Sequence, residues 1–193
     1  MLLLVLGLTL FLGVHLVPTH PALRNDLRVR FGTTPYRMGF TVVSLIGFAL
    51  IVYGYGKVQM LPGKNPQLWM PPVWTKHIAW LLMLPSLILL AASNIPSRIR
   101  SAVGHPMLLG IKIWAVAHLL ANGTLAAVIL FSTFLVWAVY DLISVKKRGA
   151  KGPLGSQEGT VGGDVAAVAI GTAFWAFMLF WGHAKLIGVA LMS

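Results

Sequence analysis

The chain contains no cysteine. This absence excludes disulfides, thiolate nucleophiles, iron–sulfur clusters, thiolate-ligated haem and covalent haem attachment through a CxxCH motif. Carboxylates are almost as scarce, because only four Asp and Glu residues occur among 193 residues. Such a composition argues against paired-carboxylate catalysis and against dimetal carboxylate sites. Any metal that the chain binds must therefore be held by histidine.

Charged residues of both signs make up only 10% of the chain, whereas 58% of the residues are hydrophobic and the mean hydropathy is +0.83. These values are typical of a polytopic membrane protein, with the lipid bilayer as its main partner. The net charge of +11 comes from short basic clusters between apolar runs. No basic helix with interleaved aromatic residues occurs, so the pattern excludes nucleic acid as a partner.

The apolar runs predict an all-α fold, a polytopic membrane bundle of six transmembrane helices in a single domain over residues 1–193. The first run has no basic n-region and no small-residue cleavage site, so we expect it to be retained as a span. The expected spans cover about 1–17, 38–55, 74–93, 106–121, 124–143 and 165–192.

Lys and Arg residues concentrate in the first, third and fifth loops between these spans. By the positive-inside rule those loops face the cytoplasm, and both termini face the periplasm. The fifth loop, residues 144–163, is so rich in glycine that we expect it to be flexible. The basic residues of the three loops are Arg24, Arg28, Arg30 and Arg37, then Arg98 and Arg100, then Lys146, Lys147, Arg148 and Lys151.

The fourth span lies within GHPMLLGIKIWAVAHLLANG, residues 104–123, and contains His118. Ionisable residues inside a membrane are costly, so each one is a candidate functional residue. Trp114, His118 and Asn122 recur at intervals of four and share one helix face, which predicts a binding site there. His105 precedes His118 by about 20 Å of helix, so the two cannot bind one metal ion. We expect His105 to cap the helix or to meet an anionic group.

His15 and His183 are also surrounded by apolar residues. Each could simply be a neutral imidazole that is hydrogen-bonded across helices. Together with His118, however, they favour a shared ligand, and haem b with one or two axial histidines is the cofactor that fits best. Zinc is the alternative, but it usually requires three or four close ligands, and the chain has no HxxxH or HExxH pair.

Four segments, LGLTLFLGVHLVP, GHPMLLGIKIWAVAHLLANG, FSTFLVWAVYDL and GHAKLIGVALM, resemble NnrU-family membrane proteins, and the resemblance covers most of the chain. It implies a helical protein of the bacterial inner membrane that is associated with nitrite and nitric oxide metabolism in denitrification. The superfamily includes the 15-cis-zeta-carotene isomerase, in which two histidines bind the iron of haem b. Their motifs resemble the sequences around His15 and His118, so the resemblance implies that these two residues are axial ligands.

Depth in the membrane favours a different pair. Counted along the helices, His15 lies about 21 Å from the outer face of the bilayer core, whereas His118 lies about 10 Å from it. The pair formed by His118 and His183 agrees better with this count and stays open as the alternative.

Three functions also stay open at this stage. The first is a haem protein that acts on nitrogen oxides by redox chemistry, ligand sensing or catalysis at the iron. The second is a haem-dependent cis–trans isomerase of an apolar polyene of the carotenoid type. The third is an accessory subunit of a larger membrane complex without a cofactor of its own. Whether the chain is an enzyme is therefore undecided by the sequence.

Overall fold

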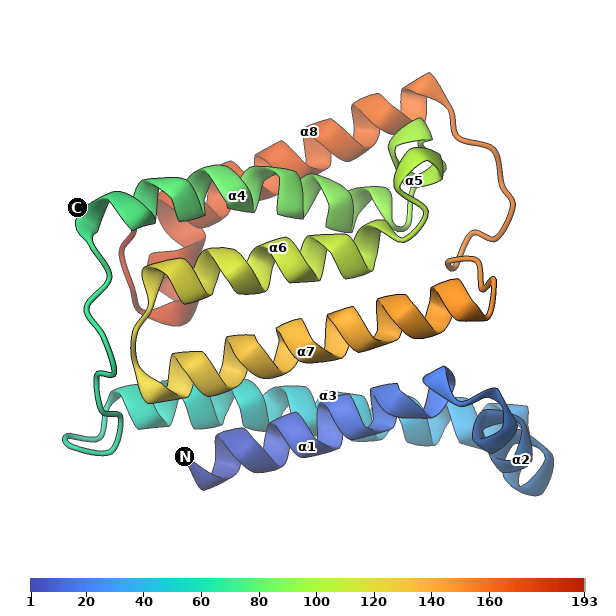
Figure 1. Ribbon diagram of the computed structural model, residues 1–193, viewed down its shortest axis with the longest axis horizontal. Helices are drawn as coiled ribbons and strands as arrows, with labels where there is room; N and C mark the ends of the chain where they lie inside the picture. Colours follow the sequence, from blue (N-terminus) through green and yellow to red (C-terminus); the bar gives the residue numbers. More distant parts are fainter. Residues whose placement is uncertain (193) are drawn as a thin grey trace. The chain divides into compact units, whose positions relative to one another are not determined.

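The computed structural model describes residues 1–192, and within that range it contains helices and turns but no β-strand. Eight of the elements in this range are α-helices, and Figure 1 labels them α1 to α8. The elements are α1 Leu2–Leu16, the 3₁₀ turn η1 Val17–Thr19, α2 Pro21–Phe31, α3 Thr33–Gln59, α4 Val73–Ala92, α5 Arg98–Val103, α6 Pro106–Ala121, α7 Leu125–Lys147, α8 Val161–Phe177 and the π-helical segment η2 Met178–Ile187.

Within residues 1–192, five helical segments are long and apolar enough to cross a membrane. They are Leu2–Thr19, Thr33–Gln59, Val73–Ala92, Leu125–Lys147 and Val161–Ile187. The all-helical, multi-pass character expected from the sequence is therefore confirmed. The remaining expected span, α6, is apolar but has only 16 residues. At 1.5 Å per residue it reaches about 24 Å, which is less than the roughly 30 Å of a typical hydrocarbon core.

The chain forms two compact units, one of residues 1–69 with 124–133 and one of residues 70–123 with the chain from 134 onward. In the first unit, α1 packs along α3. Glycines permit this packing, because a Cβ atom on Gly7 would lie 2.6 Å from the backbone nitrogen of Ile51, and one on Gly54 would lie 2.5 Å from that of Leu4. Close approach through small residues is the usual way in which membrane helices associate.

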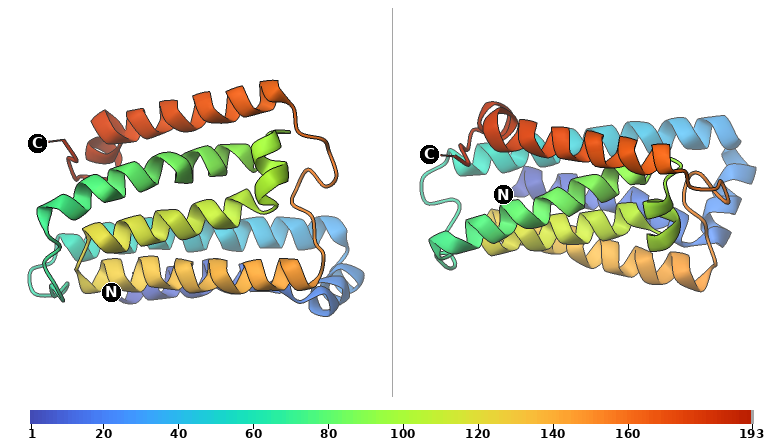
Figure 2. Two further views of the ribbon diagram at one scale, coloured as in Figure 1. Left: turned by 45° about the horizontal axis from the view of Figure 1, so that its top comes forward. Right: turned by 90° about the horizontal axis from the view of Figure 1, so that it is seen from above.

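In the second unit, α4 packs against both α6 and α8 (Figure 2). The buried Ser86 hydroxyl on α4 donates a 2.8 Å hydrogen bond to the carbonyl oxygen of Gly110 on α6. On the other side, the Trp175 indole on α8 donates a 2.9 Å hydrogen bond to the carbonyl oxygen of Trp80. These bonds fix the two helices against α4 and so position the end of α6 that carries His118.

Two stretches that the sequence analysis treats as loops contain further structure. The first basic loop includes α2, which starts with Pro21 in its first turn and ends at Gly32, where φ is 88°. Pro in the first turn and Gly after the last are favourable helix boundaries, and Arg28 and Arg30 in the last turn complement the helix dipole. The connection between the first two spans therefore contains a helix that the sequence analysis did not predict.

The expectation of a flexible loop at residues 144–163 is also wrong at both of its ends. Helix α7 continues to Lys147, and α8 begins at Val161. The segment between them is tied to the start of α5, because the Thr160 amide donates a 2.9 Å hydrogen bond to the carbonyl oxygen of Pro96. Thr160 and Ser97 also form an isolated parallel bridge.

The last span differs from the prediction in its internal structure. We expected one helix over residues 165–192, but the α-helix ends at Phe177 and a π-helical segment follows up to Ile187. That segment ends at Gly188, whose φ of 81° lies in the left-handed region. π-Helical turns are rare and frequently occur at functional sites, and this one contains His183.

Candidate functional site

His118 lies in the last turn of α6 with a half-buried ring. Its Nδ1 atom is 2.8 Å from the carbonyl oxygen of Trp114, one turn earlier. A carbonyl oxygen can only accept a hydrogen bond, so Nδ1 must carry the ring proton. In the neutral imidazole, Nε2 then has the lone pair, which is the form that binds a metal.

One aromatic ring lies beside this histidine, and a second ring packs against the first. The Trp114 ring lies 5.1 Å from the His118 ring, and Phe134 of α7 contacts the Trp114 ring edge-on at 5.4 Å. The Asn122 side chain donates a 2.9 Å hydrogen bond to the carbonyl oxygen of His118. Trp114, His118 and Asn122 thus contact one another in turn along one face of α6, and their binding of a cofactor stays a prediction.

His15, in the first unit, has the same local arrangement. Its Nδ1 atom lies 2.6 Å from the carbonyl oxygen of Phe11, again one helical turn earlier. The ring is 4.3 Å from that of Phe11 and 5.0 Å from that of Phe40 on α3. The carbonyl again places the proton on Nδ1, so Nε2 is the nitrogen with ligand character.

His183 belongs to the same unit as His118. Its Nδ1 atom is 2.9 Å from the carbonyl oxygen of Val189, just beyond the π-helical segment. All three histidines therefore share one pattern, in which a main-chain carbonyl orients the ring through Nδ1. Within residues 1–192, no group of three or more His, Asp or Glu residues could hold a metal ion, which argues against zinc.

The opposite end of α6 has a different character. His105 occupies the N-cap position of α6, but its side chain forms no capping hydrogen bond, so the predicted capping role is wrong. Burial lowers the pKa of His105 below its usual value, and Asp141 opposes this effect. Asp141 and Lys146 thus act on His105 in opposite directions, and His105 does not cap the helix.

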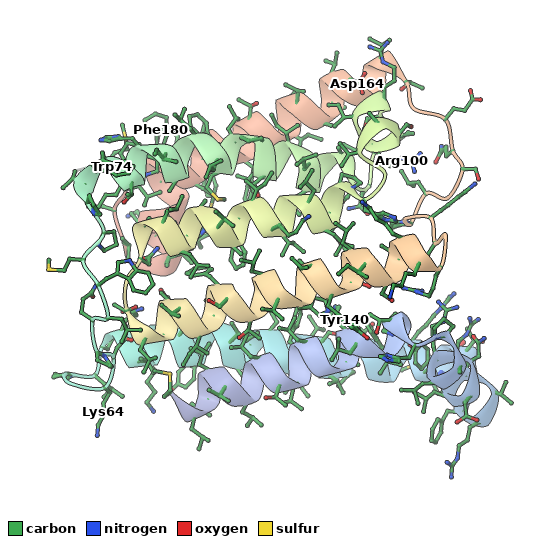
Figure 3. The ribbon with its side chains drawn as sticks, viewed as in Figure 1. Lys64, Trp74, Arg100, Tyr140, Asp164 and Phe180 are labelled. Atoms are coloured by element: carbon green, nitrogen blue, oxygen red, sulfur yellow. The ribbon has the colours of Figure 1, made fainter. Side chains whose placement is uncertain are left out.

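Two arginines on α5 lie near this end, where Figure 3 shows Arg100 and Asp164. Arg98 forms a 2.7 Å ion pair with Asp164 of α8, which also accepts a 3.0 Å hydrogen bond from the Ile99 amide. Arg100 is only 7% exposed and donates to the carbonyl oxygens of Gly155 and Gln157. In the sequence these arginines indicate only the topology, because the carbonyl partners of Arg100 lie more than 50 residues further along the chain.

The family model described as NnrU protein matches residues 3–191, which is nearly the whole chain. No curated protein and no solved structure matches the chain.

Proposed function

This chain belongs to the NnrU family, and on that premise we propose that it binds haem b through histidines and acts in nitrite and nitric oxide metabolism during denitrification. The observation that carries the haem proposal is the hydrogen bond from His118 Nδ1 to the carbonyl oxygen of Trp114. It leaves the lone pair on Nε2 of a half-buried imidazole in an apolar helix. A nitrogen of this kind is a common axial ligand of haem b, and a chain without cysteine offers no thiolate instead.

His15 and His118 are the proposed axial ligands, and His118 with His183 is the alternative pair. The bond between His15 and the Phe11 carbonyl gives His15 the same protonation state as His118, and the bond to the Val189 carbonyl does the same for His183, so both pairs offer two Nε2 lone pairs. Trp114 and Asn122 have supporting roles, because Trp114 covers the imidazole and Asn122 holds the carbonyl of the ligand residue. When bound, haem b supplies redox chemistry and an iron centre that takes nitrogen oxides as ligands.

We also propose six spans with both termini in the periplasm, in the inner membrane of a bacterium. The uneven distribution of basic residues supports this topology, and α6 would be the short sixth span. A short helix can be accommodated by local thinning of the bilayer. Reporter fusions to each terminus test the proposal, because six spans place the termini on one side, whereas five place them on opposite sides.

The decisive experiment is the absorption spectrum of the purified protein, oxidised and reduced, with and without added haem. We expect a Soret band that shifts on reduction and on addition of nitric oxide. A protein that has no Soret band even after haem is added would overturn the proposal. Co-purification with a stoichiometric membrane partner and no cofactor would instead support an accessory subunit.

A haem-containing protein could still be an isomerase of an apolar polyene. Incubation of the reduced protein with 15-cis-zeta-carotene, followed by analysis of the isomers, separates this activity from nitrogen-oxide chemistry. Isomerisation without any effect of nitric oxide on the spectrum would replace the proposed function by the isomerase.

A further inference from the structure

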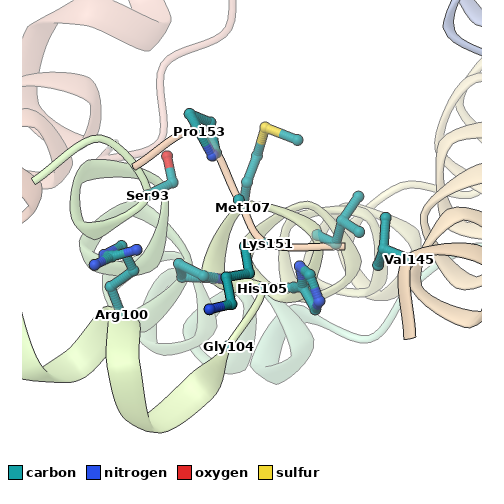
Figure 4. A pocket seen from close by; sticks show the side chains of 11 residues that line it. Ser93, Arg100, Gly104, His105, Met107, Val145, Lys151 and Pro153 are labelled. Carbon is teal, nitrogen blue, oxygen red and sulfur yellow. The ribbon is translucent and has the colours of Figure 1, made fainter. Parts of the chain in front are cut away.

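A small pocket lies where α5, the start of α6 and the segment 148–160 meet (Figure 4). Its volume is about 110 Å³, and a wider groove of about 570 Å³ adjoins it and shares five of its residues. Pockets for drug-sized ligands usually measure about 300–1,000 Å³, so the inner pocket suits a single small group. The shared residues are Arg100, Gly104, His105, Lys151 and Gly152.

Arg100 provides the main evidence for the nature of that group. Its side chain lines the pocket and is buried, yet its charge has no carboxylate partner within residues 1–192. Two of its nitrogens donate to main-chain carbonyls, whereas the buried Nε has no acceptor among these residues. A buried charge normally needs a counter-charge, and the neighbouring Arg98 has one in Asp164. An anion in the pocket would therefore balance the buried charge of Arg100.

Two other basic side chains line the same pocket as Arg100. His105 and Lys151 line the pocket, and the Lys151 ammonium is held by a 2.6 Å hydrogen bond to the Ser156 hydroxyl. Met107 and Leu108 of the first turn of α6 also line it, at a helix start that no side chain caps. The first amide groups of a helix lack partners within the helix and attract anions.

Acidic groups near this end do not neutralise the pocket. Glu158 lines the outer groove but not the inner pocket. Asp141 acts on His105 electrostatically, together with Lys146, and lies 3.9 Å from Arg148. The inner pocket itself is lined by Arg100, His105 and Lys151 without a carboxylate.

We propose that this pocket binds a phosphate group, with Arg100, Lys151 and the first turn of α6 as its main contacts. The group comes from the headgroup of an anionic phospholipid or from soluble phosphate. Arg and Lys side chains and a helix N-terminus are the groups that proteins use for phosphate. The proposal does not depend on haem, because the pocket lies at the end of α6 opposite to His118.

The test uses the full-length protein in detergent and two kinds of probe. Inorganic phosphate is titrated by calorimetry, and retained phosphatidylglycerol is counted by native mass spectrometry after purification from mixed phosphatidylglycerol and phosphatidylcholine. The variants are Lys151→Gln, which changes the pocket, and Lys147→Gln, which removes the same charge nearby but outside the pocket. Because Arg100 also ties down the segment 148–160, Arg100→Gln is interpreted only when its circular dichroism and melting match the parent.

We expect Lys151→Gln to weaken phosphate binding, or to reduce the retained phosphatidylglycerol, by about tenfold, since a charge-assisted hydrogen bond is lost. Lys147→Gln should change either quantity by less than about twofold, because an exposed charge outside the site is screened. A loss confined to phosphatidylglycerol identifies a lipid headgroup, and a loss confined to phosphate identifies the soluble anion. No binding of either probe, or an equal loss in both variants, would overturn the proposal.

Discussion

The two ends of α6 place histidine in opposite environments. His118 lies in the last turn against the Trp114 ring, and a main-chain carbonyl fixes its proton on Nδ1. His105 lies just before the first turn, and it shares a pocket with Arg100 and Lys151. The first environment favours an imidazole that acts as a ligand, and in the second the imidazole lies beside basic side chains that favour an anion.

This difference shows that the side chain alone does not decide what a membrane histidine does. The two residues are 13 positions apart on one helix, about 20 Å at 1.5 Å per residue. They are therefore far enough apart to be changed independently. If the two ends have separate functions, substitutions at one end should leave the ligand of the other end in place.

The largest expected effect is the loss of haem from the His118 end. In His118→Ala we expect haem affinity to fall by more than about 100-fold, since removal of an axial ligand exceeds the 10- to 100-fold cost of losing an outer contact. His105→Ala is the matched control and should keep the Soret band. The measurement is a haem titration followed by absorbance. Equal losses in both variants would show that the two ends are not independent.

A large effect on stability is expected from Gly163, in the first turn of α8, which lies against the segment that precedes α5. A Cβ atom there would overlap the carbonyl oxygen of Pro96, whereas one on the neighbouring Gly162 would meet only the Thr160 hydroxyl at 4.0 Å. We expect Gly163→Ala to destabilise the fold by about 1–3 kcal/mol, as overpacking usually does. That corresponds to a fall in Tm of about 2–4 °C for each kcal/mol.

Thermal unfolding in detergent, with Gly162→Ala as the control, tests this prediction. The control should melt within about 2 °C of the parent, because exposed substitutions usually change stability by less than about 0.5 kcal/mol. Equal melting of the two variants would mean that the contact with Pro96 contributes little.

These glycines also show which features of the structure the sequence does not predict. The α6 prediction of 106–121 matches the observed helix, because Pro106 and the polar Asn122 mark its ends locally. The glycine-rich segment after α7 was expected to be flexible, yet Gly159 and Gly163 approach the backbone of Pro96 and Ser97 closely. Glycine permits both a flexible loop and a close approach of two backbones, and composition cannot distinguish these two cases. The residues approached, Pro96 and Ser97, lie more than 60 positions away in the chain.

Other features were present in the sequence but were weighted too little. Helix α2 has Pro21 at its start and Gly32 at its end, and both are ordinary boundary signals. By contrast, the change from α-helix to π-helix at Met178 leaves no trace in the apolar pattern. The carbonyl partners of His15 and His118 at i−4 follow from helix geometry, but that of His183 depends on the reversal at Gly188.

A smaller effect on haem affinity is expected from Asn122, which follows the last turn of α6 beside His118. Its side-chain amide holds the carbonyl of His118 through a 2.9 Å hydrogen bond, and such a bond is worth about 0.5–1.5 kcal/mol. In Asn122→Ala we therefore expect haem affinity to fall by about two- to tenfold, while phosphate binding stays unchanged. The same haem titration measures this change. An effect as large as that of His118→Ala would make Asn122 more than a supporting residue.

The smallest expected effect is a pH dependence of anion binding in the pocket that His105 lines. Burial lowers the pKa of His105, so the neutral ring stabilises the fold above pH 6.5, and this contribution is lost as the pH falls below 6.5. A bound anion acts in the opposite direction and raises this pKa, so binding takes up a proton. Sulfate is the suitable probe, because its charge does not change between pH 6 and pH 8. The charged groups that face His105 are Arg100 and Lys151 in the pocket, Glu158 in the adjoining groove, and Asp141 and Lys146, which act on it electrostatically.

We therefore expect sulfate affinity to rise as the pH falls from 8 to 6, by less than tenfold per pH unit, which is the limit for uptake of one proton. In His105→Gln the affinity should not vary with pH, because glutamine keeps a polar side chain but cannot be protonated. Calorimetry in two buffers with different ionisation enthalpies measures the proton uptake directly. Uptake that persists in His105→Gln would assign the proton to another group, and the contrast between the two histidines of α6 would then rest on His118 alone.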